Sequence, residues 1–269
     1  MKQDIRVLIV EDDPYARDLM TLLLARDWRT RVIADLPSEE DALKSVGSML
    51  GHVDVIIFDT EIPGQSGWPE RLFQWAQSQK RRPAFLCTGT KYDPEILKRI
   101  CAVKAGGYVL KGEIHYTLGW AVAMADAGRW VTTPGIYTSA KQEGIRLPQG
   151  ALLLNGTHLA ANLTDREAEI ARLAILFNMA RRNLADELQI SPDWAFEVVS
   201  VAYEKLGLAD ILSGTAEPES YFEDQPLLAD YFRDILARVS TSPKKENRLD
   251  KDTLAFHLLT VPDVQEIRG

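Results

Sequence analysis

Short apolar runs alternate with longer segments of helical periodicity through the first half of the chain. The apolar runs are rich in β-branched residues and occupy positions 5–10, 30–35, 54–58, 83–88 and 107–110. In the segments between them, apolar residues recur three and four positions apart, as they do along one face of a helix. Strands and helices that alternate in this way predict an α/β fold, in which helices cover both faces of a parallel sheet.

Polar and charged residues stand at the ends of these predicted strands. The first run is followed by Glu11 and Asp12, the third by Asp59, the fourth ends in Thr88 and the fifth is followed by Lys111. Because the carboxyl ends of parallel strands meet at one edge of a sheet, we expect these side chains to converge. Two carboxylates about 4 Å apart repel each other by about 4 kcal/mol at an effective dielectric of about 20, so the cluster calls for a cation.

The chemistry of this cluster narrows the choice of cation and reaction. Carboxylate oxygens are hard ligands that suit Mg²⁺, which keeps several waters and also accepts phosphate oxygens as ligands. A lysine beside such a site adds a positive charge for a phosphate, and a threonine adds a hydroxyl group. The residue types therefore predict phosphoryl transfer onto a carboxylate.

Four motifs in this region resemble those of a known family. They are LIVEDDP (8–14), FDTEIPG (58–64), LCTG (86–89) and YVLKGE (108–113). In order and spacing they resemble the receiver domain of two-component response regulators, over residues 1–126. The resemblance implies a five-stranded, doubly wound, flavodoxin-like sheet and a histidine kinase or phosphotransfer protein as partner. It implies no enzyme activity beyond self-catalysed phosphoryl transfer to and from the domain itself.

The resemblance also implies a role for each motif residue. Asp59 would be the phosphoacceptor, and Lys111 would contact the phosphoryl group. Thr88 and Tyr108 would form the switch pair, in which the hydroxyl moves toward the phosphate and the ring turns inward. The ligands of Mg²⁺ would be Glu11, Asp12, Asp59 and the backbone carbonyl of Glu61.

Residues 127–162 lack helical periodicity and carry glycine and proline at the spacing of turns. Asn155-Gly156 lies between two apolar or alternating runs, which is a strong signal for a two-residue β-hairpin. We therefore expect a structured linker that contains a hairpin.

Residues 163–212 show the signals of several short helices. Thr164 and Glu167 have the spacing of a capping box, and Ser191 followed by Pro192 is typical of a second helix start. Short helices joined by tight turns indicate a helix-turn-helix domain. The segments LTDRE, LADELQIS and YEKLGL resemble the DNA-binding domain of the LuxR/NarL type.

The predicted recognition helix departs from that pattern. Phe196, Glu197 and Val198 stand where the family has lysine, a polar residue and often histidine, and Val201 and Glu204 replace an asparagine and an arginine. We regard this helix as degenerate for reading DNA. The candidate interaction face that it leaves consists of Trp194, Phe196, Glu197, Val198 and Val201.

Charge supports a role other than DNA binding. The whole chain has a net charge of −8, and between residues 163 and 210 nine acidic residues outnumber five basic ones. A protein that binds DNA neutralises phosphates with lysine and arginine, which supplies essentially all of its non-specific affinity. We expect the output to be protein–protein interaction or homodimerisation. The alternative is a DNA-binding transcription regulator of the LuxR/NarL type.

Residues 213–269 form an additional C-terminal extension. A single apolar stripe at helical spacing predicts an amphipathic helix, with Leu227, Leu228, Tyr231, Phe232, Ile235, Leu236 and Val239. We favour a helix that packs back on its own domain, and the alternative is a helix that docks a partner or a second copy.

The composition bears on the cellular compartment of the protein and on whether its second half is an enzyme. No apolar run approaches the roughly 20 residues of a membrane span, and the two cysteines, Cys87 and Cys101, lack the spacing of metal ligands. We expect a reduced cytoplasmic protein without membrane contact. After residue 126, neither a nucleophile paired with a base nor a phosphate-binding loop is present, so the sequence gives no support for an enzymatic output domain.

Overall fold

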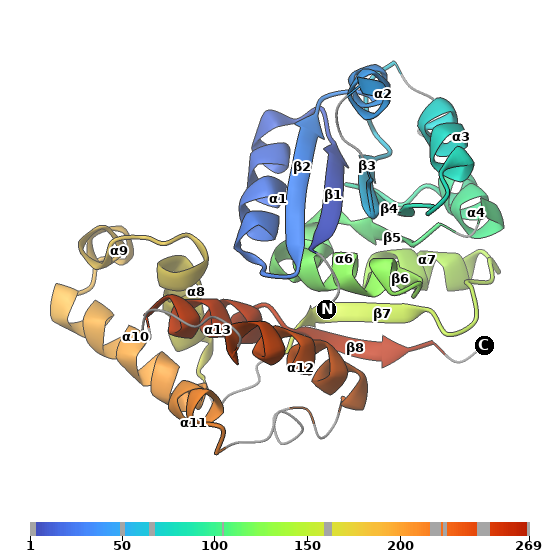
Figure 1. The fold of residues 1–269 in the computed structure, drawn as a ribbon. Helices are drawn as coiled ribbons and strands as arrows, with labels where there is room; N and C mark the ends of the chain where they lie inside the picture. The colour runs from blue at the N-terminus through green and yellow to red at the C-terminus, as the bar shows by residue number, and fades with distance from the viewer. Residues whose placement is uncertain are drawn as a thin grey trace. The chain divides into compact units, whose positions relative to one another are not determined.

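The structure is a computed structural model that describes residues 4–48, 52–64, 68–103, 105–158, 163–215, 222, 225–240 and 248–267. The chain forms two compact units (Figure 1). The first unit comprises Met1–Ala25, Arg29–Gly156 and Pro262–Gly269, and the second comprises Arg26–Trp28 and Thr157–Val261. We describe each unit by itself.

The first unit is built on one sheet of eight strands in the order β2-β1-β3-β4-β5-β6-β7-β8. The first five strands are parallel and confirm the predicted α/β fold and the 2-1-3-4-5 order typical of flavodoxin-like sheets. Their bounds are β1 Ile5–Val10, β2 Thr30–Leu36, β3 Val55–Asp59, β4 Ala84–Gly89 and β5 Gly107–Leu110. The central strand β3 is buried at every position, because helices cover both of its faces.

The helices of the first unit follow the strands in alternation. α2, α3 and α4 share one hydrophobic core on one face of the sheet, and α1 and α6 lie on the other (Figure 1). The bounds are α1 Pro14–Arg26, α2 Glu39–Ser48, α3 Glu70–Ser78, α4 Pro94–Val103, α5 Lys111–Ile114, η1 His115–Thr117 and α6 Leu118–Asp126. α6 is buried from Leu118 to Ala125, as its nearly continuous apolar sequence requires.

The region expected to be a linker instead extends the sheet. β6 (Val131–Thr132) pairs in parallel with β5, α7 (Pro134–Gln142) follows, and β7 (Leu152–Thr157) pairs in parallel with β6. β7 runs through Asn155-Gly156, so the predicted hairpin turn does not form at that dipeptide. Pairing of β7 with distant strands outweighs the local turn preference. The expected second arm of the hairpin extends into residues 159–162, which lie outside the described residues.

The C-terminal residues return to the first unit. β8 (Pro262–Glu266) lies beside β7 at the end of the sheet, and the Ile267 amide donates to the Ala151 carbonyl at 2.8 Å. The Arg129 guanidinium donates to Glu266 at 2.7 Å and to the Gly150 carbonyl at 3.1 Å. The second unit is therefore inserted, in sequence, between two adjacent strands of the first.

The second unit is helical. Its helices are α8 Asp165–Leu176, α9 Arg181–Leu188, α10 Pro192–Lys205, α11 Leu208–Ser213, α12 Pro226–Ser240 and α13 Arg248–Leu259. The capping box of α8 is present, with the Glu167 amide donating to the Thr164 hydroxyl at 3.3 Å, and Ser191 caps α10. α8, α9 and α10 pack around a core that includes Ile170 and Leu184, as expected for a helix-turn-helix domain.

The C-terminal extension contributes two helices to this unit. α12 buries Leu228, Phe232 and Ile235 of the predicted stripe, as expected for a helix that packs within its own domain. α13 packs against α8 and α11, and the Tyr203 hydroxyl of α10 donates to Asp252 of α13. In the described part of the chain, no helix combines the length and apolar character needed to cross a membrane.

Candidate functional site

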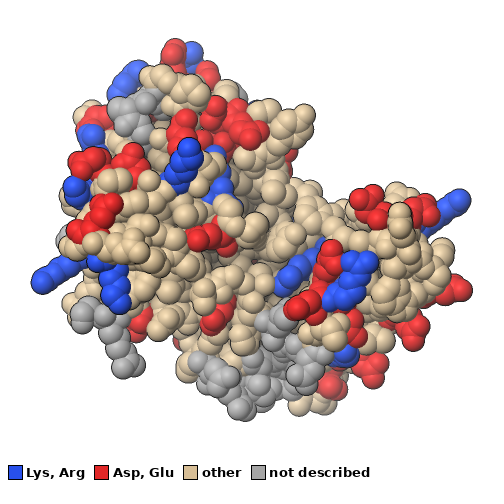
Figure 2. All heavy atoms as spheres, turned by 180° about the vertical axis from the view of Figure 1, so that it is seen from behind, with Lys and Arg blue, Asp and Glu red and all other residues tan. Residues whose placement is uncertain are grey.

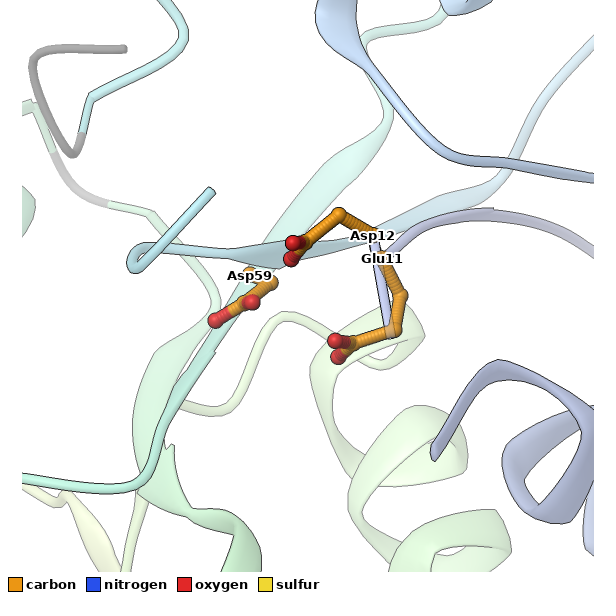
Figure 3. Close-up of side chains that lie close together, drawn as sticks. All are labelled: Glu11, Asp12 and Asp59. Atoms are coloured by element: carbon orange, nitrogen blue, oxygen red, sulfur yellow. The ribbon is translucent and has the colours of Figure 1, made fainter. Parts of the chain in front are cut away.

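Three carboxylates meet at the carboxyl edge of the sheet in the first unit (Figure 3). β1 and β3 are neighbours, and Val10 is in register with Phe58, so the next residues Glu11 and Asp59 lie side by side. Asp12 follows Glu11 and turns its carboxylate toward the other two. Ligand atoms of all three residues lie within 4.8 Å of one another, close enough to share one ion.

Lys111 supplies a positive charge from the end of β5. Its ammonium nitrogen lies 2.8 Å from Glu11 Oε2 and 3.0 Å from Asp59 Oδ2. Glu11 and Asp59 are almost fully buried, with side-chain exposures of 1% and 2%. One ammonium cannot balance three carboxylates, so the cluster keeps an excess of negative charge.

The pKa values of both buried carboxyls are shifted mainly by burial. Burial raises the pKa of Glu11 to about 7; the Lys111 hydrogen bond opposes that rise, and the charge of Asp59 adds to it. Burial also raises the pKa of Asp59, again against the effect of Lys111. The pKa of Lys111 is raised although burial lowers it, because the hydrogen bond with Glu11 and the charge of Asp59 favour the ammonium form.

The donor set fits a hard divalent cation. All three residues offer carboxylate oxygens, which suit Mg²⁺. Among the described residues, none donates a well-aligned hydrogen bond to the buried Glu11 Oε2. A cation at this position would stabilise the ionised form of both buried carboxylates.

Glu61 contacts the site through its backbone. Its amide donates to Asp59 Oδ1 at 3.1 Å, so the chain turns closely around the acceptor candidate. Its side chain is exposed and accepts hydrogen bonds from the backbone amide and the hydroxyl of Thr90, in the segment after β4. The sequence placed Glu61 near Asp59 but gave no sign of this second contact, because the partners are 29 positions apart.

Thr88 lies on β4, the strand next to that of Asp59, and Tyr108 lies on β5, one strand further along the sheet. Thr88 is in register with Asp59 and is fully buried. Tyr108 is also fully buried, and its hydroxyl donates to the Lys91 carbonyl at 2.9 Å. Burial raises the pKa of Tyr108 to about 12, so the phenol stays protonated and can donate. Tyr108 therefore contacts the segment that connects β4 to α4.

Thr60 and α7 are parts of this region that the sequence analysis missed. The Thr60 hydroxyl donates to the Thr88 carbonyl at 2.9 Å. α7 buries Ile136 and Ala140 in the same hydrophobic core as Tyr108. Pro134-Gly135 had the composition of a turn, whereas Pro134 in fact begins the helix.

The residues proposed as an interaction face on α10 do not all reach the surface. Trp194 and Phe196 are 40% and 51% exposed, Glu197 is exposed, and Val201 is partly exposed. Val198 is buried in the core of the second unit, so it does not belong to the face. The phase of the helix explains this, because Val198 shares the inward side with Ala195 and Ala202.

Exposed charges near these aromatic residues are mainly negative. Among the side chains that the structure describes on α9 and α10, the exposed charges are Asp186, Glu187, Asp193, Glu197 and Glu204 against Arg182 and Lys205. Figure 2 shows one face of the molecule, on which acidic and basic side chains are interspersed and broad areas carry neither.

Comparison with known proteins agrees with this geometry. Residues 7–118 match the family described as the response regulator receiver domain. Over 205 residues the chain is 27% identical to the response regulator GacA of Pseudomonas viridiflava, covering 76% of this chain and 91% of the relative. A protein-glutamate methylesterase/protein-glutamine glutaminase of Paramagnetospirillum magneticum is 31% identical over 106 residues, which cover 39% of this chain and 29% of the relative.

A solved structure shows a partial likeness to this chain. The response regulator RcsB of Salmonella typhimurium, in a structure titled for conformational dynamism in DNA interaction, is 18% identical. That match covers 77% of this chain and 92% of the solved chain, with a TM-score of 0.44. The family match and the acidic site carry the assignment for part of the chain: residues 7–118 are a response regulator receiver domain.

Proposed function

We propose that Asp59 accepts a phosphoryl group from a phosphohistidine of a kinase or phosphotransfer protein. The observation that carries this proposal is the convergence of Glu11, Asp12 and Asp59 within 4.8 Å, with Lys111 bound to two of them. Glu11, Asp12 and Asp59 would hold Mg²⁺, together with the backbone carbonyl of Glu61. The ion would neutralise charge on the transferred group and on the acceptor.

Each residue has a distinct part in the transfer. A carboxylate oxygen of Asp59 forms the bond to phosphorus while the bond from phosphorus to the imidazole nitrogen breaks, and the imidazole keeps that electron pair. Lys111, 3.0 Å from Asp59 Oδ2, is placed to contact an oxygen of the incoming group. Catalysis of this kind depends mainly on positioning and charge stabilisation.

The response to phosphorylation starts from charge. The phosphoryl group adds about −1.5 to −2 at the end of β3. Thr88, in register with Asp59 on the neighbouring strand, carries a hydroxyl that would donate to this group. Movement of Thr88 changes the space beside Tyr108 on the neighbouring strand. The equilibrium between conformations of the β4–α4 segment shifts as a result.

We propose that the output is a protein contact made by α10, with homodimerisation as one form of it. Support comes from the exposed aromatic pair Trp194 and Phe196, which lies among acidic residues. Aromatic side chains are enriched in the centres of protein interfaces. DNA binding is the alternative, and the excess of acidic over basic side chains, among those described as exposed on α9 and α10, disfavours it.

Labelling with a small phosphodonor tests the acceptor. The wild-type chain, incubated with ³²P-labelled acetyl phosphate and Mg²⁺, should gain one labelled group that is labile at high pH. Asp59→Asn should abolish the labelling. Asp13→Asn is the matched control, because Asp13 is exposed and caps the start of α1. Equal labelling of Asp59→Asn and the wild type would remove Asp59 as acceptor.

A second experiment separates the two outputs. Sedimentation of the full chain with and without beryllofluoride should show self-association, which Phe196→Glu weakens and Ser200→Ala, on an exposed position of the same helix, leaves unchanged. In parallel, binding to duplex DNA is measured at low and physiological salt. Tight, sequence-selective DNA binding at physiological salt, unchanged by Phe196→Glu, would favour the alternative.

A further inference from the structure

We propose that the side chain of Glu61 is an electrostatic tie that holds the β4–α4 segment (residues 90–93) until Asp59 is phosphorylated. The proposal rests on the function proposed above and adds a positioning residue to it. Glu61 would couple the charge of Asp59 to this segment by repulsion, in addition to any attraction between the phosphoryl group and Thr88.

The contact uses both oxygens of one carboxylate. The Thr90 amide donates to Glu61 Oε2 at 2.5 Å, and the Thr90 hydroxyl donates to Glu61 Oε1 at 2.9 Å. A charged acceptor with two donors makes a stronger contact than a neutral hydrogen bond. The amide of the same residue donates to Asp59 Oδ1 at 3.1 Å. Glu61 therefore contacts both the acceptor and the β4–α4 segment.

Neighbouring positions are held by neutral groups. The Tyr108 hydroxyl donates to the Lys91 carbonyl at 2.9 Å, and the Thr60 hydroxyl donates to the Thr88 carbonyl at 2.9 Å. At Gly89 an added Cβ would lie 3.0 Å from Thr60 Oγ1 and 3.2 Å from the Tyr108 hydroxyl, so the backbone is closely packed. Among these contacts, the one made by Glu61 is the one that depends on an anion.

Phosphorylation of Asp59 would repel the Glu61 carboxylate. The site already contains the carboxylates of Glu11, Asp12 and Asp59, and the phosphoryl group adds further negative charge two residues before Glu61. Repulsion between like charges therefore weakens the Glu61–Thr90 contact in the phosphorylated state. Release of Thr90 frees the backbone next to Thr88, whose hydroxyl can then move toward the phosphoryl group.

Beryllofluoride mimics the phosphoryl group. Its binding affinity therefore reports the free energy needed to break the contact between Glu61 and Thr90. Calorimetry would be performed on the full chain in saturating Mg²⁺, for the wild type, Thr90→Val, Glu61→Ala and the double variant. Thr90→Val loses one of the two hydrogen bonds and should bind beryllofluoride about threefold more tightly. Glu61→Ala loses the whole tie and should bind about tenfold more tightly, with its backbone carbonyl unchanged.

The double variant shows whether Glu61→Ala acts through the contact with Thr90 or only by removing a negative charge near Asp59. If both substitutions act on one contact, the double variant should bind no more tightly than Glu61→Ala. Glu61→Asp is the matched control, because it keeps the charge but shortens the side chain by one methylene. It should therefore also lose the Thr90 contact and bind more tightly than the wild type. The proposal would be wrong if both single variants bound beryllofluoride as the wild type does or more weakly. It would also be wrong if the gains in affinity of the single variants added up in the double variant.

Hydrogen exchange of the Thr90 amide gives an independent readout that a merely structural role would not change. In the unliganded wild type, we expect this amide to be protected, and Glu61→Ala should remove the protection. Saturation with beryllofluoride should remove it in the wild type as well. A wild type that binds no beryllofluoride would overturn the acceptor assignment and the tie together. A wild type that binds it while Thr90 stays protected would overturn the tie alone.

Discussion

The ammonium group of Lys111, which follows β5, lies 3.0 Å from the carboxylate of Asp59 at the end of β3, with only β4 between the two strands. It also lies 2.8 Å from Glu11 Oε2, so one cation serves two buried acids. The positive charge of Lys111 should therefore weaken the binding of Mg²⁺ to the site and strengthen the binding of a phosphoryl group or its mimic.

Lys111→Met should tighten the binding of Mg²⁺ and weaken the binding of beryllofluoride. Loss of the ammonium makes the carboxylate cluster more negative, which favours the metal, and it removes a positive contact for the anion. We expect each affinity to change by about tenfold, as for loss of one partly buried charge. Calorimetric titration of each ligand tests the signs. Lys91→Met, at an exposed position after β4, should change neither affinity, and shifts of the same sign would contradict the proposed site.

Tyr203→Phe should destabilise the second unit. The Tyr203 hydroxyl donates to Asp252, which joins α10 to α13. A hydrogen bond to a charged acceptor contributes about 1.5–3 kcal/mol, so unfolding should require that much less free energy. Urea denaturation followed by circular dichroism measures the change. Ser200→Ala is the control on the same helix and should have little effect. Equal stabilities for Tyr203→Phe and the wild type would mean that the hydrogen bond between Tyr203 and Asp252 does not form in solution.

Glu167→Gln should change the pH dependence of the second unit's stability. The Lys205 hydrogen bond, followed by the Thr164 amide, lowers the pKa of Glu167 from 4.5 to about 2. A carboxyl whose folded pKa is lowered stabilises the fold above its unfolded pKa, and this contribution is lost as the pH falls toward the folded value. Glu167→Gln should therefore be less stable than the wild type at pH 6.

The difference between these two proteins should narrow as the pH is lowered from about 4.5 to about 2. Urea denaturation at pH 2.5, 4 and 6 measures it. Glu169→Gln, which removes an exposed ion pair with Arg166 on the same helix, should show a much smaller pH effect. A gap that is constant with pH would contradict a role for the ionised Glu167.

Removal of residues 262–269 should destabilise the first unit, although these residues are the last in the chain. β8 pairs with β7, and Glu266 accepts a hydrogen bond from Arg129. Loss of an entire strand should lower the melting temperature by several degrees. Glu266→Gln, which removes only the exposed ion pair, should lower stability by less than about 1 kcal/mol. Scanning calorimetry compares the melting temperatures of the truncated chain and of Glu266→Gln with that of the full chain. Identical melting curves for the truncated and full chains would argue against the pairing of β8 with β7.

The receiver core and its acidic site were predictable because their determinants are local. Each strand has its own apolar run, and the residues Asp59 and Lys111 stand directly at strand ends, so a parallel sheet brings them together. The capping box of Thr164 and Glu167 was readable for the same reason, because cap and partner lie three positions apart.

Features that depend on distant partners were not predictable. Asn155-Gly156 has the composition of a turn, but β7 runs through it because β6 and β8 are available on either side. Val198 looked like part of an apolar surface, and only the packing of α10 on α9 shows that it faces inward. The contact of Glu61 with Thr90 joins two loops that follow different strands.

The position of β8 has a consequence for the order in which the chain folds. A ribosome synthesises the other seven strands well before residues 262–266, and 104 residues, 158–261, separate β7 from its partner. The outer edge of β7 therefore stays unprotected during translation, and such an edge invites pairing with other chains. Completion of the sheet must also wait for closure of a long loop, which makes this pairing slow compared with local contacts. Newly made chains are thus exposed to aggregation through this edge until residues 262–266 have been synthesised and have paired with β7.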